Sequence, residues 1–155
     1  MTDSTPVPSL PSTQPDRILF AMIAVLALAG VIVSGISLQR HYARSATAFC
    51  DFAQKFSCDI VNRSEQSSII GIPVAGIGVA GYGALLLLST FGRSAVDSPN
   101  RLLGAAIAGL AFALYLTYIE AYVLEAWCIL CLTSLALIGS ITLCAIALRL
   151  RSARA

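Results

Sequence analysis

Four long runs of apolar residues constrain this chain more than any other feature of its sequence. They extend from about residue 18 to 38, 69 to 91, 102 to 123 and 127 to 148. Each is close to the ~20 helical residues that cross the ~30 Å hydrocarbon core of a bilayer. Because 57% of all residues are hydrophobic and only 12% are charged, the chain cannot cover a water-facing surface. The sequence therefore predicts an all-α membrane protein, an antiparallel bundle of four transmembrane helices.

The remaining segments divide the chain further. Residues 1–16 are rich in proline and hydroxyl residues, which predicts a disordered tail. We expect a membrane domain over residues 17–150, a long polar loop over 39–68 and a basic tail over 151–155. The first apolar run is too long for the core of a signal peptide and lacks an A-x-A site, so we expect it to be a retained helix.

The placement of arginines predicts how the bundle is oriented. With four spans, both termini and the second loop share one side, and that side carries most of the arginines. Cytoplasmic segments of membrane proteins are enriched in Lys and Arg. We therefore expect a multi-pass protein of the inner (cytoplasmic) membrane, with both termini cytoplasmic. This places every cysteine except Cys144 on the extracytoplasmic side, where disulfides form and persist.

Charge and composition exclude several classes of function. The net charge of +2 and the lack of a basic tract give no indication of nucleic-acid binding. A single histidine, His41, argues against histidine-rich metal sites and against Ser/His/Asp catalysis. The chemistry is therefore expected at the 5 cysteines.

Four of these cysteines form two pairs. Cys50 and Cys58 lie in the polar loop, whereas Cys128 and Cys131 form a C-x-x-C at the start of the fourth apolar run. Residues three apart lie on one face of a helix, and the positive end of the helix dipole stabilises a thiolate. The pattern is consistent with a redox site, but also with packing, with structural disulfides or with a four-thiolate zinc site. Cys144 stands alone further along the helix, and we expect it to be a packing residue.

These motifs resemble a known family. The loop pair in "FCDFAQKFSC", the stretch "SIIGIPVAGIGVAGYG" and the later "WCILCLTS" are together similar to the vitamin K epoxide reductase family, and particularly to its bacterial members. The resemblance extends over about residues 17 to 150. It implies a DsbB-like enzyme that re-oxidises a periplasmic thioredoxin-like (DsbA-like) protein and reduces a membrane quinone, either ubiquinone or menaquinone. Since the chain ends at Ala155 without a thioredoxin-like domain, the partner is expected to be a separate protein.

The resemblance also implies a role for each cysteine. Cys50 would exchange with the partner, and Cys58 would relay to Cys128 through a transient disulfide. Cys131 would donate electrons to the quinone. Ser64 falls where the family places a loop serine or threonine near the active site.

Other residues fit the family less closely. The second span has no asparagine and position 135 is Leu135, whereas animal members hold the quinone with an asparagine and a tyrosine. Epoxide reduction is therefore not implied.

We expect Glu120 and Glu125 to be solvated charges in a turn, with proton handling as the alternative. The tyrosines are expected to pack, or else to line a quinone slot; they are Tyr82, Tyr115, Tyr118 and Tyr122.

Two other functions remain open at this stage. The protein could carry reducing equivalents outward across the membrane without quinone, or it could be a non-enzymatic, cysteine-stabilised membrane module.

Overall fold

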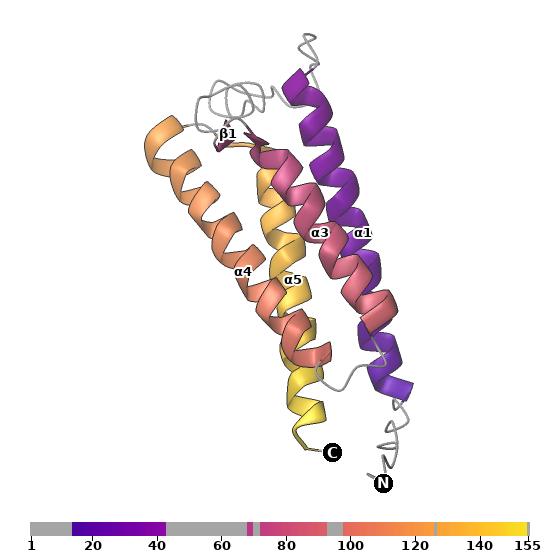
Figure 1. Cartoon of the computed structure of the whole chain (residues 1–155). Helices are drawn as coiled ribbons and strands as arrows, with labels where there is room; N and C mark the ends of the chain where they lie inside the picture. The colour runs from indigo at the N-terminus through magenta and orange to yellow at the C-terminus, as the bar shows by residue number, and fades with distance from the viewer. Residues whose placement is uncertain (1–13, 43–67, 70–71, 93–97, 126, 155) are drawn as a thin grey trace, which may run out of the picture.

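The structure is a computed structural model that describes residues 14–42, 68–69, 72–92, 98–125 and 127–154 (Figure 1). Within these residues the chain forms four long helices: α1 (Gln14–Tyr42), α3 (Val74–Phe91), α4 (Ser98–Ile119) and α5 (Ile129–Ser152). A π-helical turn, η3 (Glu120–Leu124), continues α4, and two short antiparallel strands, β1 (Ser68–Ile69) and β2 (Ile72–Pro73), precede α3. The predicted tail over residues 1–16 falls largely outside the described part, which begins at Gln14.

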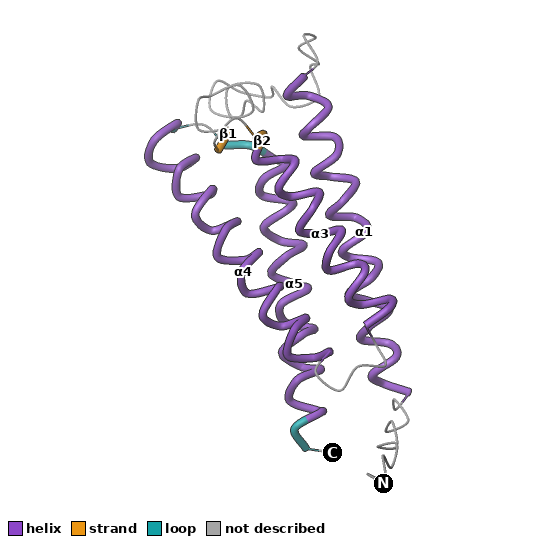
Figure 2. The backbone as a smooth tube through the Cα atoms, viewed as in Figure 1, coloured by secondary structure: helices purple, strands orange, loops and turns teal. Residues whose placement is uncertain are grey.

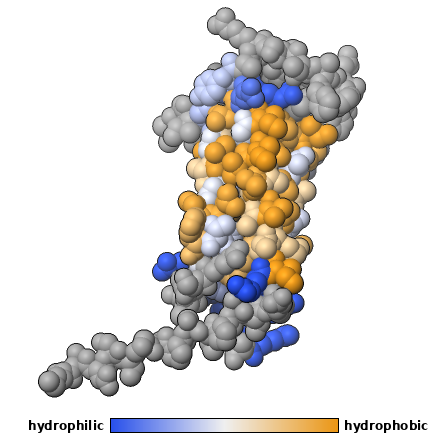
Figure 3. Space-filling view, turned by 90° about the vertical axis from the view of Figure 1, so that its right-hand side faces the viewer, coloured by the Kyte–Doolittle hydropathy of each residue, from blue (hydrophilic) through white to orange (hydrophobic). Residues whose placement is uncertain are grey.

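All four helices are long and apolar enough to cross a membrane. In the space-filling view of Figure 3, a broad apolar band separates hydrophilic residues near the two ends of the molecule. Large hydrophobic side chains such as Val25, Leu87 and Leu143 are exposed on the outside of the bundle. An apolar exterior is stable only in lipid, so the chain is a multi-pass membrane protein. The predicted all-α bundle of four transmembrane helices is confirmed.

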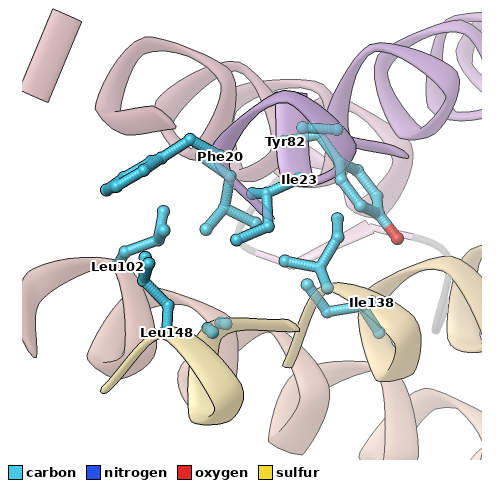
Figure 4. Close-up of a cluster of buried hydrophobic side chains, with 11 residues drawn as sticks. Phe20, Ile23, Tyr82, Leu102, Ile138 and Leu148 are labelled. Atoms are coloured by element: carbon cyan, nitrogen blue, oxygen red, sulfur yellow. The ribbon is translucent and has the colours of Figure 1, made fainter. Parts of the chain in front are cut away.

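The helices pack around a core that contains several small residues. α1 packs along α3 and α5, and α4 packs along α5, whereas α3 and α4 contact each other over a shorter stretch (Figure 2). Ala27, Ala106 and Ala145 are fully buried and allow the helix backbones to approach closely. Around them lie the larger side chains that Figure 4 labels, which are Phe20, Ile23, Tyr82, Leu102, Ile138 and Leu148.

The second span begins later than the sequence predicts. The apolar run starts at Ile69, but the helix starts at Val74, after the two paired strands. Pro73 lacks a backbone N–H and disfavours a helical conformation at Ile72, so Ile72 stays extended and pairs with Ile69. Pro73 then precedes the first helical residue, with φ −59° and ψ 132°.

The connection between α4 and α5 has unusual backbone geometry. η3 widens the last turn of α4, and Glu125 follows it with φ 48° in the left-handed region. The Glu125 N–H donates to the carbonyl oxygen of Glu120 and closes the turn. Single π-helical turns are rare and occur frequently at functional sites. This connection lies at the end of the bundle opposite to the first residues of α1 and the last residues of α5 (Figure 1).

Candidate active site

The C-x-x-C pair lies at the N-terminus of α5. Cys128 is the N-cap residue with extended backbone (φ −104°, ψ 117°), and its carbonyl oxygen accepts a 3.0 Å hydrogen bond from the Leu132 N–H. Cys131 follows in the first helical turn, where unpaired backbone N–H groups and the helix dipole favour negative charge. The backbone at this point is therefore suited to a thiolate.

The two thiols have different surroundings. Cys128 is completely buried and packs against Leu124 and Leu130. Cys131 is half-buried, and it lines a cavity that Cys128 does not reach. Cys144 lies elsewhere on α5, packed against the main core and outside the cavity. Its surroundings agree with the packing role expected from the sequence.

The carboxyl group of Glu120 contacts both cysteines. Glu120 is only 2% exposed, and its Oε2 accepts a 3.2 Å hydrogen bond from the backbone N–H of Cys128. The Cys131 side chain interacts with the same carboxyl group. The other carboxylate oxygen of Glu120, Oε1, is buried without a hydrogen-bond partner among the described residues. The site thus combines two thiols and one carboxyl group.

The expectation that Glu120 is a solvated charge is wrong. Glu120 lies four residues after Leu116 on the same face of the helix, which lines the cavity, so it points into the bundle. Tyr118 and Tyr122 lie on the opposite face and are exposed. Glu125, five residues later, is exposed as expected. The sequence does contain an indication that Glu120 is buried, because it is the one charged residue within the predicted third span. Ionisable residues inside a span usually have a functional role.

A cavity of about 360 Å³ lies between the four helices, next to Cys131. This volume is within the range of small-molecule and cofactor sites. Its walls are mainly apolar, and small residues from α3 and α4 form much of them, namely Ala75, Gly78, Gly81, Ala105, Ala108 and Gly109. Its polar lining consists of a few side chains, namely Ser34, Ser37, His41, Tyr82, Glu120, Cys131 and Ser134.

Tyr82 connects α3 to α5 within this lining. Its hydroxyl donates a 2.7 Å hydrogen bond to the Ser134 carbonyl oxygen and lies 2.8 Å from the Ser134 hydroxyl. Since the phenol has one proton and a carbonyl can only accept, the Ser134 hydroxyl is the donor in the second bond. Tyr82 can pack this closely against α1 because residue 30 is glycine; a Cβ there would overlap the ring. Tyr115, Tyr118 and Tyr122 do not line the cavity and are 56% exposed or more.

Several residues singled out from the sequence are not placed by the structure. Cys50, Cys58 and Ser64 lie outside the described residues, so their roles remain predictions. Leu135 is half-buried and does not line the cavity. In the described ranges no three His, Cys, Asp or Glu side chains gather as metal ligands.

A comparison with models of known protein families matches residues 21–147 to the vitamin K epoxide reductase family. The chain belongs to this family. The match extends from within α1 to within α5 and includes the residues that line the cavity and the C-x-x-C pair. The protein is therefore a membrane oxidoreductase of the thiol–disulfide type.

The residues of this vitamin K epoxide reductase family member fit a quinone. A quinone ring is flat and apolar on its faces, and the glycine and alanine walls leave room for such a group. Its two carbonyl oxygens need hydrogen-bond donors, which the serine, histidine and thiol groups of the lining can provide. The single thiol in the lining, Cys131, is thus the cysteine among the described residues that a bound quinone would meet.

Proposed function

We propose that the protein is a quinone-dependent thiol–disulfide oxidoreductase that re-oxidises a separate thioredoxin-like protein. The observation that carries this proposal is that Cys131 lines a mainly apolar cavity, while its partner Cys128 is buried outside it. In this proposal Cys50 exchanges with the thiol of the soluble partner. Cys58 then relays the electrons to Cys128 through a transient Cys58–Cys128 disulfide. A quinone of the ubiquinone or menaquinone class accepts the electrons.

The two cysteine pairs react with different partners because each partner can reach only one of the pairs. A folded thioredoxin-like protein cannot reach a cysteine that is buried inside a bundle, because exchange requires access to the sulfur. A lipid-soluble quinone can enter an apolar cavity between membrane helices. Two cysteine pairs, one in a polar loop and one at the cavity, connect the two reactants.

The ends of the polar loop support this arrangement. Tyr42 at the end of α1 and Ser68 at the start of β1 both lie at the end of the bundle that carries Cys128 (Figure 1). The described residues on both sides of the segment that contains Cys50 and Cys58 therefore lie at that end. Arg101, Arg149 and Arg151 lie at the other end, which supports a cytoplasmic location for both termini and an extracytoplasmic location for the C-x-x-C. The proposed setting is an inner membrane with an oxidising outer side.

The chain's own residues account for the reaction at the cavity. Cys131 lies in the first turn of α5, where unpaired backbone N–H groups favour negative charge, and we propose that it forms a disulfide with Cys128, three residues earlier. When bound, a quinone supplies a two-electron acceptor that becomes a hydroquinone. The Cys128–Cys131 dithiol loses two electrons and two protons as its S–S bond forms, so electrons and protons balance.

The proposal is tested with purified protein in lipid nanodiscs, a reduced thioredoxin-like partner and a soluble quinone analogue. Quinone reduction, followed by absorbance, is expected to proceed with the wild type and to be abolished in Cys131→Ala. Cys144→Ala is the matched control, because it removes a thiol of the same helix outside the cavity, and it is expected to keep activity. Full activity in Cys131→Ala would refute the proposal.

A further inference from the structure

Glu120 is a buried carboxyl group that disulfide exchange between the cysteines does not require. It is 2% exposed, it lines the cavity and it lies against both cysteines. Burying a carboxyl group in a lipid-facing bundle is costly unless its oxygens are hydrogen-bonded. Here Oε2 accepts the Cys128 N–H, but Oε1 has no partner in the described part of the chain.

A purely structural role explains only half of this arrangement. Accepting the first N–H of the α5 terminus is a capping function that a neutral amide would perform as well. It does not explain why the second oxygen is left without a partner among the described residues, in a carboxyl group that interacts with the Cys131 side chain and lines a cavity. An unpartnered acceptor in that position is available to a proton from the thiol or from a bound molecule.

We propose that Glu120 is the proton acceptor for Cys131 and passes that proton to an oxygen of the molecule reduced in the cavity. This inference rests on the function proposed above. Glu120 takes the proton from the Cys131 sulfur, and the thiolate electrons leave as the Cys128–Cys131 bond forms. The carboxyl group then gives the proton to a quinone oxygen and returns to its initial state. The second proton, from the Cys128 thiol, goes to the other quinone oxygen as the S–S bond forms, so two thiols and one quinone give one disulfide and one hydroquinone.

Other titratable groups face the same cavity from other helices. His41 lines it from α1 and Tyr82 lines it from α3. The Tyr82 hydroxyl donates to the Ser134 carbonyl oxygen and accepts from the Ser134 hydroxyl, and a neutral phenol is a poor base for a thiol proton. His41 is the rival acceptor, so the experiment has to separate it from Glu120.

The first test uses the reactivity of the thiol and needs no quinone. Fully reduced protein is alkylated with N-ethylmaleimide over a range of pH, and the modification of Cys131 is followed by peptide mass spectrometry. Glu120→Gln keeps an acceptor for the Cys128 N–H but cannot take a proton. Without the acceptor, forming the thiolate adds an uncompensated buried charge, so we expect about tenfold slower alkylation of Cys131 at neutral pH.

The sign of the change distinguishes the two roles. If Glu120 were only a nearby negative charge, its removal would favour the thiolate and would speed alkylation. Faster or unchanged alkylation in Glu120→Gln would therefore overturn the inference. Slower alkylation in His41→Gln, with Glu120→Gln unchanged, would assign the role to His41 instead and would also overturn it. Cys144 in the same samples reports any general loss of structure, and Glu125→Gln is the matched control because Glu125 is exposed.

The second test measures quinone reduction. Loss of general acid–base catalysis typically lowers a rate by about 10²-fold or more. We expect this loss in kcat for Glu120→Gln, with Glu120→Asp recovering part of it and showing an altered pH profile. A wild type that reduces no quinone would contradict the proposed function. A wild type that reduces quinone, with Glu120→Gln equally fast, would contradict only the role of Glu120.

Discussion

Removing one hydroxyl group tests the geometry of the cavity wall. In Tyr82→Phe the ring that packs against Gly30 is retained, while the two hydrogen bonds to Ser134 are lost. A hydrogen bond between protein groups contributes ~0.5–1.5 kcal/mol, and bonds between transmembrane helices average about 0.6 kcal/mol. We therefore expect the free energy of unfolding to fall by about 1 to 2 kcal/mol.

A double-mutant cycle separates the two bonds. Ser134→Ala removes the hydroxyl that donates to Tyr82 but keeps the carbonyl oxygen that accepts from it. Ser134→Ala should therefore cost about half as much as Tyr82→Phe, close to ~0.6 kcal/mol. In the Tyr82→Phe background the same substitution should cost almost nothing, because its partner is already absent.

The assay is reversible unfolding of purified protein in mixed micelles, with SDS as the denaturant and circular dichroism as the signal. Tyr118→Phe is the matched control; Tyr118 is 59% exposed, and a change within ~0.5 kcal/mol is expected. If Tyr82→Phe were no less stable than Tyr118→Phe, or if the cycle were strictly additive, the hydrogen-bonded contact between α3 and α5 would be refuted.

Two further predictions concern backbone positions. Gly30→Ala should destabilise the bundle by about 1–3 kcal/mol in the same unfolding assay, because the added methyl overlaps the ring of Tyr82; Gly35→Ala, which has no neighbour within 4 Å, is the control and should change little. Glu125→Gly should stabilise the protein by up to about 1 kcal/mol, since Glu125 holds a left-handed conformation that glycine adopts without strain. If Gly30→Ala were as stable as the wild type, the close packing of Tyr82 against α1 would be contradicted. If Glu125→Gly were less stable than the wild type, the strained turn at Glu125 would be contradicted.

The sequence was sufficient to predict the bundle because lipid imposes a simple rule. A segment that crosses the bilayer must satisfy its backbone internally and present apolar side chains, so hydropathy alone locates four helices. Hydropathy does not distinguish a helix from a short extended stretch of the same composition. The predicted start of the second span is therefore too early, because Pro73 precedes the helix.

The active site could be predicted only in part. The position of Cys128 and Cys131 at the start of the fourth apolar run correctly indicates a helix N-terminus. Glu120 is not a solvated turn residue because the helix continues through η3 to Leu124, and a π-helical turn has no sequence pattern of its own that would reveal this. The contact of Tyr82 with Ser134 joins residues 52 positions apart, and no periodicity within either helix encodes it.

The electron transfer from the cysteine pair to quinone is tested most directly by a single turnover. Protein reduced at all cysteines is mixed anaerobically with a quinone analogue, and the absorbance of the quinone and the disulfides formed are measured together. We expect one Cys128–Cys131 disulfide to form for each quinone that is reduced. Neither the disulfide nor quinone reduction is expected in Cys131→Ala. Quinone reduction that proceeds without this disulfide, or that persists in Cys131→Ala, would contradict the proposed electron transfer.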